Sequence, residues 1–166
     1  MPRTRTIPDA QVYASIHRLL AEGGDKAVSF GSVAKVTGLS PPTLVQRYGN
    51  REGMVRAARL AAWEALEHRT AEAIANSANK GPQGLLKAIG PVDPASFAAD
   101  LRDPELATRA NGWRLGVETA LTLRLGGGQK ARESAALLFA AWQGQALWSG
   151  VGEPAFRLKD AVKRLT

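Results

Sequence analysis

Two short helical segments separated by only three residues, within residues 29–51, constrain the fold more than any other feature of the chain. Ser29 is a good N-cap for the first segment, and Gly38 is placed to adopt the left-handed conformation that ends a helix. Ser40 can cap the second segment, whose first turn holds Pro41, where a missing N–H costs nothing. A helix this short buries little surface, so its neighbours must hold it. The layout is that of a helix-turn-helix, whose second helix enters the DNA major groove.

Longer helices are predicted on both sides of this pair. Pro8-Asp9 opens the first of them, Gly23-Gly24 ends it, and Asn50 caps a long helix that follows. In both helices apolar residues recur three and four positions apart, which places them on one buried face. These residues are Val12, Ile16, Leu19 and Leu20 in the first helix, and Met54, Ala58, Ala61, Ala65 and Leu66 in the long one. Leu44 and Tyr48, four apart in the short second segment, are expected to face the same interior.

The remainder of the chain is predicted to be helical as well, with breaks at Gly81-Pro82 and at residues 90–94. Further helices are expected over Pro82–Ile89, Ala95–Arg102, Pro104–Leu125, Lys130–Trp148 and from Glu153 to about Leu165. No run shows the alternation of a strand bounded by turn signals. No stretch approaches about 18 uninterrupted apolar residues, so no membrane span is expected. The predicted fold class is all-α.

The positive charge of the chain is concentrated around the two short helices. The net charge is +7 and the sequence pI is about 10.2, which favours an anionic partner. Between residues 26 and 59 the single acid is Glu52, whereas the basic residues are Lys26, Lys35, Arg47, Arg51, Arg56 and Arg59. From residue 70 onward twelve Lys and Arg face nine Asp and Glu, the balance of an ordinary solvated surface. The distribution therefore supports nucleic-acid binding by the N-terminal third.

Several other classes of protein have little support in the sequence. There is no cysteine, which suits a reducing cytoplasm, and the first ten residues lack the apolar run of a signal peptide. The two histidines, His17 and His68, form no metal-binding pair, and no nucleophile-elbow pattern is present. Residues 126–130 are glycine-rich but do not match a phosphate-binding loop, so they are interpreted as a helix stop and loop. We therefore expect a cytoplasmic, non-enzymatic protein without a metal or cofactor.

An ordered set of short motifs runs through the N-terminal third of the chain. It comprises Val33-Ala34, Gly38-Leu39-Ser40, Pro42-Thr43-Leu44, an aromatic residue at Tyr48 and Asn50-Arg51-Glu52. With these motifs the N-terminal third resembles the tetracycline-repressor (TetR) family of bacterial transcriptional regulators. The resemblance covers about residues 12–58. It implies a three-helix DNA-binding domain over residues 1–50 and a helical ligand-binding and dimerisation domain over residues 51–166. It also implies a homodimeric repressor that binds double-stranded DNA. A small-molecule ligand would release this repressor from its operator.

Carried over position by position, the resemblance assigns contacts with bases and phosphates. The implied DNA-binding residues are Ser29, Ser40, Thr43, Gln46, Arg47, Asn50 and Arg51. Among them, Thr43, Gln46 and Arg47 carry most of the expected specificity. Arg3 and Arg5 could extend this surface as an arm toward the minor groove.

The chain departs from the family pattern at three positions. Val45 stands where the family usually has a tyrosine that touches phosphate. Gly31 replaces a polar or charged residue, and Pro41 removes a polar side chain that could read a base. The operator therefore cannot be inferred from relatives.

The C-terminal two-thirds would supply the dimer contact and a ligand pocket. Residues 135–148 are apolar on most sides, so a helix there needs cover from its own domain or from a partner. This helix is one candidate element of the dimer interface, and a short helix near residues 155–159 could be the other. In a homodimer the two reading helices would lie about 34 Å apart, or somewhat further. The candidate lining of a pocket for an apolar or aromatic effector is Trp63, Trp113, Val117, Leu121 and Trp142. Indoles at helical spacing are, however, more often core residues.

A second hypothesis belongs to a different class. The Pro41-Pro42 pair and the missing tyrosine at position 45 are also compatible with a helical protein- or small-molecule-binding module whose sequence-specific DNA binding has lapsed. In that case the basic segment would act only as a weak general site for polyanions.

Overall fold

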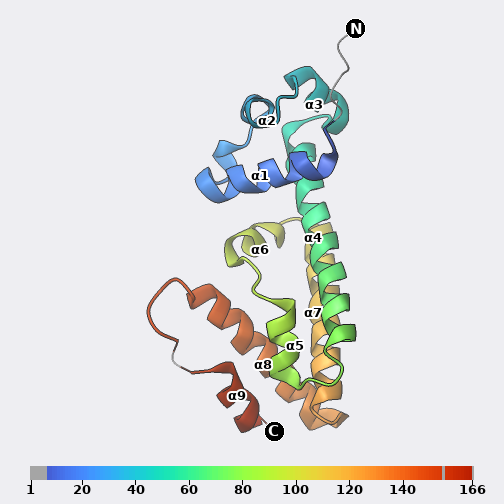
Figure 1. Cartoon of the computed structure of the whole chain (residues 1–166), viewed down its shortest axis with the longest axis vertical. Coiled ribbons are helices and arrows are strands. Elements are labelled where there is room, and N and C mark those ends of the chain that lie inside the picture. The colour runs from blue at the N-terminus through green and yellow to red at the C-terminus, as the bar shows by residue number, and fades with distance from the viewer. Residues whose placement is uncertain (1–6, 155, 166) are drawn as a thin grey trace. The chain divides into compact units, whose positions relative to one another are not determined.

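The computed structural model describes residues 7–154 and 156–165, and this part of the chain is helical without strands (Figure 1). The elements are α1 (Asp9–Gly23), the 3-10 turn η1 (Asp25–Ala27), α2 (Phe30–Thr37), α3 (Pro41–Tyr48), α4 (Arg51–Asn76), α5 (Pro82–Ile89), α6 (Pro94–Asp100), α7 (Pro104–Arg124), α8 (Gly128–Trp148) and α9 (Leu158–Leu165). The all-α prediction is confirmed. None of the helices described is long and apolar enough to cross a membrane.

The helix ends follow local capping chemistry, and the largest difference from the predicted bounds is at α9. Its start was predicted near Glu153, but the helix begins at Leu158. Gly152 has a φ of 74°, and Pro154 follows two residues later, so the preceding segment cannot continue a helix. The helix starts where Arg157 meets Asp160, whose carboxylate accepts a hydrogen bond from Arg157 Nε at 2.8 Å.

The chain divides into two compact units, residues up to Ala65 and residues from Leu66 onward. The predicted boundary after residue 50 coincides with the start of α4, whereas the first unit also includes the first half of this helix. The reason is packing, because α4 contributes buried side chains to the core of the first unit. That core consists of Val12, Ile16, Val28, Val33, Ala34, Leu44, Met54, Val55 and Ala58. His17 Nε2 lies 3.0 Å from the carbonyl oxygen of Ala58 and so links α1 to α4.

The second unit is built around the α7–α8 hairpin, with α5 and α6 packed on it and α9 against α8 and α5 (Figure 1). Its centre is an aromatic cluster of Trp113, Phe139 and Trp142, whose ring centroids lie 5.6–6.2 Å apart. The indole N–H of Trp113 donates to Thr70 Oγ1 at 2.9 Å, which satisfies the polar atom inside the core. α4 is thereby joined to α7 within this unit.

Two charged contacts complete the α4–α7 pairing in the second unit. Arg109 forms a forked ion pair with Glu67, at 3.0 and 2.5 Å. Near the end of α4, Arg124 donates to the carbonyl oxygens of Ile74 and Ser77, at 3.1 and 3.3 Å. A cation at the C-terminal end of a helix is favourable because the last carbonyl groups are otherwise unpaired. Neither contact was predicted from the sequence.

Candidate nucleic-acid interface

α2, the turn over residues 38–40 and α3 form the helix-turn-helix that the sequence predicts. Gly38 ends α2 with a φ of 77°, in the left-handed region, and its N–H donates to the carbonyl oxygen of Ala34. Ser40 then begins α3, because its side chain accepts a hydrogen bond from the backbone N–H of Thr43 at 3.3 Å. In α3 only Leu44 is fully buried, and Tyr48 is half-buried. Because only Leu44 is fully buried, most of the surface of α3 is open to a partner.

The two predicted phosphate-binding serines lie exposed at the N-terminal ends of α2 and α3. Ser29 accepts from the backbone N–H of Ser32 at 3.0 Å, and Ser32 Oγ accepts from the N–H of Ser29 at 2.9 Å. This reciprocal cap was not predicted, because a serine rather than the usual glutamate or glutamine supplies the return contact. Ser32 Oγ also donates to the carbonyl oxygen of Ala27 at 2.8 Å, which ties α2 to the preceding turn.

Arg47, predicted to contact DNA, is directed toward the start of α1. Its Nη1 donates to the carbonyl oxygen of Ile7 at 2.8 Å and lies 3.5 Å from Asp9 Oδ1. The same carboxylate oxygen accepts from the hydroxyl of Tyr48 at 2.5 Å. One acid therefore binds both C-terminal side chains of α3. Contacts between residues about forty positions apart leave no local signal in the sequence, so sequence reasoning missed Asp9.

Arg51 and Asn50, also predicted DNA contacts, organise the start of α4. Asn50 Oδ1 accepts from the backbone N–H of Gly53 at 2.7 Å, which confirms its capping role. Arg51 Nε donates to the carbonyl oxygen of Val28 at 2.7 Å, and its Nη2 donates to the Asp25 carboxylate at 2.8 Å and to the Asp25 carbonyl. The guanidinium thus connects α4 to the turn before α2. The Asn50 side chain remains exposed, whereas that of Arg51 is 29% exposed.

The remaining predicted contacts lie on the outer side of α3. Gln46 is exposed and Thr43 is partly exposed, with the Thr43 hydroxyl 2.8 Å from Ser40 Oγ. Lys26 and Lys35 are exposed basic residues of the same unit. Arg3 and Arg5, the predicted arm, lie outside the described residues. The first unit therefore gathers exposed polar side chains and basic residues around α3, a combination suited to a polyanion.

Replacing Asp9 is expected to loosen the end of α3. Asp9→Asn keeps the size of the side chain but removes the charge that faces Arg47, so we expect a loss of about 1 kcal/mol in the free energy of unfolding. A double-mutant cycle with Tyr48→Phe, measured by urea unfolding, isolates the contact from the favourable effect of an acid in the first turn of α1. Glu22→Gln, which removes an exposed acid of α1 that faces Arg18 of the same helix, is the control. Equal losses in Asp9→Asn and Glu22→Gln would contradict the contact.

The phenol of Tyr48 makes this contact insensitive to pH near neutrality. Burial raises the pKa of Tyr48, and the hydrogen bond to Asp9 and the negative charge of Asp9 raise it further. Because the folded-state pKa lies above the unfolded-state value of about 10, the stabilisation is complete below that pH. It is lost only as the pH rises through the folded-state pKa.

The predicted ligand-pocket residues are all buried, but they do not surround one cavity. Trp113 and Trp142 pack against Phe139, Val117 and Leu121 are fully buried, and Trp63 belongs to the first unit. A hollow of about 340 Å³ lies between α4 and α7. Of the five predicted residues, Trp113 and Val117 line it. The other lining residues are Glu67, Thr70, Ala71, Ile74, Arg109, Gly112 and Gly116.

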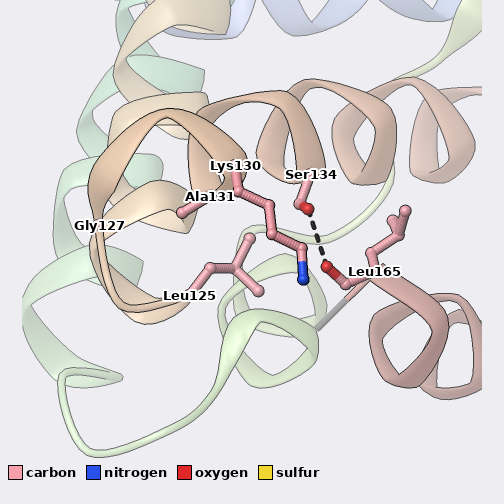
Figure 2. Close-up of a pocket in the computed structure, with 6 residues that line it drawn as sticks. All are labelled: Leu125, Gly127, Lys130, Ala131, Ser134 and Leu165. Carbon is pink, nitrogen blue, oxygen red and sulfur yellow. Dashed lines mark hydrogen bonds between the residues drawn. The ribbon is translucent and has the colours of Figure 1, made fainter.

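A second, smaller cavity of about 190 Å³ lies where the start of α8 meets the end of α9 (Figure 2). Ser134 Oγ donates to the carbonyl oxygen of Leu165 at 2.8 Å, and the Lys130 side chain extends between Leu125 and Leu165. Ligand sites for drug-sized molecules usually span about 300–1,000 Å³, so this cavity is small for such a molecule. In the described part of the chain no cluster of three or more His, Cys, Asp or Glu could hold a metal ion.

Comparison with known proteins identifies the fold. No protein-family model matches the sequence, and no curated protein matches it. The chain is similar in structure to a transcriptional regulator from Rhodococcus sp. Rha1, with a TM-score of 0.69 and 23% sequence identity. The similarity covers 96% of this chain and 94% of that protein. The chain therefore has the helical fold of that regulator along nearly its whole length.

Proposed function

We propose that this chain is a cytoplasmic, homodimeric DNA-binding transcriptional regulator of the TetR type, most simply a repressor that a small-molecule effector releases from its operator. The observation that carries the proposal is the helix-turn-helix of α2 and α3, whose second helix exposes Gln46 and part of Thr43 beside the basic residues of the first unit. The fold shared with a protein described as a transcriptional regulator supports it.

In this proposal some residues around α3 contact DNA, and others hold the helices in place. Gln46 and Thr43 face the base edges, and Ser29, Ser40 and Asn50 face phosphates from helix N-termini. The hydrogen bonds of Arg47 and Arg51 hold α3 and α4 in place, so these two arginines act first as positioning residues. Their charge still contributes to the attraction of DNA, because both lie close to the proposed contact surface.

A homodimer is proposed from the unpaired face of α8. One side of this helix is buried in the second unit through Ala135, Leu138, Phe139 and Trp142. The other side exposes Ala136, Leu137, Ala140, Leu147 and Trp148, with Leu137 59% and Trp148 64% exposed. A row of apolar and small side chains at helical spacing favours close packing against a second helix. A second copy supplies the same helix and gives the two-fold symmetry that paired half-sites need.

The proposed effector site is the hollow between α4 and α7. Its size falls in the usual range for small-molecule sites, and Ile74, Trp113 and Val117 give it an apolar lining. The Glu67–Arg109 ion pair lies among its lining residues and adds polar groups. These features support an apolar or aromatic effector.

The alternative, a helical ligand- or protein-binding module with lapsed DNA specificity, is favoured by one observation. Both arginines nearest to α3, Arg47 and Arg51, are engaged in hydrogen bonds within the first unit. The two proposals differ in one measurable property, which is whether the protein prefers one DNA sequence over another at physiological salt.

The experiment that tests the proposal is a gel shift with the DNA upstream of the gene for this chain, repeated between about 50 and 200 mM salt. Affinity should fall linearly on a log–log plot, with about 0.9 added to the slope by each phosphate contact. Gln46→Ala and Thr43→Ala should each weaken binding by about 1–3 kcal/mol without changing the melting temperature. Gln83→Ala, an exposed glutamine of α5, should leave affinity unchanged. Unchanged affinity in both α3 variants would exclude α3 as the reading helix.

A further inference from the structure

The outward face of α3 carries few hydrogen-bonding side chains. Leu44 is fully buried and fixes the inward direction of the helix. At 100° per residue, Pro42 and Gln46 then lie opposite Leu44, with Val45 and Thr43 on the two flanks. Val45 is 44% exposed, so its methyl groups are open to a partner. The surface that would meet a base edge therefore centres on a proline ring and an amide, with an aliphatic side chain on one flank and a hydroxyl on the other.

The groups that read guanine are directed elsewhere. Arg47 is the one basic residue in the sequence of α3, and its guanidinium donates to the carbonyl oxygen of Ile7 beside Asp9. Arg51, the next basic residue, is bound to Val28 and Asp25. Arginine or lysine donating to guanine is the commonest specific contact in the major groove. Here both arginines nearest to α3 already bind groups of the first unit.

The chemistry that remains matches one kind of base pair. The thymine C5-methyl is the apolar group that a base pair presents in the major groove, and aliphatic side chains contact it. A glutamine amide pairs with the N6 and N7 atoms of adenine. We propose that Val45 and Gln46 make this protein a reader of A·T pairs, with Val45 packed against a thymine methyl group and Gln46 bound to adenine. This inference rests on the proposed function, because it names the bases that the same helix recognises.

The second exposed valine of the helix-turn-helix provides a matched control. Val36 lies on α2 and is 38% exposed, close to the exposure of Val45. It belongs to the supporting helix, and the proposal gives it no base contact. Truncation of either valine to alanine removes a similar exposed apolar area, so both variants should fold equally well. If Val45→Ala and Val36→Ala differ in DNA recognition, the difference therefore comes from the position of the side chain. It does not come from the loss of exposed apolar area, because both variants lose a similar area.

The experiment compares thymine with uracil, which lacks only the C5-methyl group. The probe is the duplex most enriched from a random pool by the wild-type protein, synthesised with each thymine in turn replaced by uracil. At one position per half-site, uracil should weaken wild-type binding by about fourfold, the value expected for one buried methyl group. Val45→Ala should bind the thymine and uracil duplexes equally, whereas Val36→Ala should discriminate like the wild type. Gln46→Ala should lose the preference for adenine at the neighbouring position.

The outcomes separate this inference from the proposed function. An enriched duplex that tolerates uracil at every position would overturn the role of Val45 while leaving sequence-specific binding intact. Discrimination retained by Val45→Ala would overturn it as well, because another side chain would then contact the methyl group. Enriched half-sites rich in G·C pairs would contradict the readout by both residues. Failure to enrich any duplex would contradict the proposed function, and this inference would fail with it.

Discussion

Leu44→Ala is expected to destabilise the first unit by about 2–5 kcal/mol and to abolish the proposed sequence-specific DNA binding. Leu44 is the fully buried side chain of α3, and it packs in the core formed by α1, α2 and the start of α4. A helix of eight residues gains little stability of its own, because nucleation is unfavourable and few turns follow it. Loss of its anchor should therefore release α3 before the rest of the unit unfolds.

Amide hydrogen exchange measures this effect residue by residue. In Leu44→Ala the amides of α3 should lose protection most, followed by those of α1 and α2, whereas those of the α7–α8 hairpin should change little. Val45→Ala, one position along and on the outer surface, is the control and should leave protection unchanged. Protection of α3 equal to that of the wild type would show that another contact holds the helix.

Leu137→Glu is expected to convert the proposed dimer into a monomer and to weaken binding to the proposed operator by about 10²–10⁴-fold. Leu137 lies in the exposed apolar row of α8, and a glutamate there would place two buried carboxylates at a two-fold interface. A dimer binds its second half-site as an intramolecular step, and this gain of about 10²–10⁴ is lost when the subunits separate. The fold of each subunit should persist, because the side chain points away from its own core.

Sedimentation velocity gives the mass of the species, and a gel shift gives the affinity in the same buffer. Leu101→Glu, at an exposed leucine between α6 and α7, is the control for adding a charge and should remain dimeric. A monomeric wild-type protein, or a dimeric Leu137→Glu variant, would show that the exposed row of α8 is not the subunit contact.

The helix-turn-helix could be predicted from the sequence because its determinants are local. Ser29, Gly38 and Ser40 fix the helix ends through contacts within four residues, and the structure has α2 and α3 between them. The inward position of Leu44 followed from helical spacing alone. The same reasoning gave the bounds of α5 correctly, because Pro82 at its first position and Gly90 after its end are both sequence signals.

The parts that could not be predicted depend on contacts between distant residues. Arg47 and Arg51 were assigned to DNA from their position beside α3, but the structure gives both of them partners in the first unit, 23 to 40 residues away. The arrangement of the tryptophans is a second case. Helical spacing places Trp113 on a buried face, but it does not reveal that Phe139 and Trp142 fill the adjoining space.

Selection from a random DNA pool at about 150 mM salt tests the central claim most directly, because it needs no knowledge of the operator. If α3 reads DNA in a homodimer, one sequence family should be enriched. It should be two-fold symmetric, with half-site centres about 10–10.5 base pairs apart or somewhat further. Gln46→Ala should alter the selected sequence. Recovery of an unchanged random pool, with only weak binding that disappears as salt rises, would contradict sequence-specific recognition by this protein.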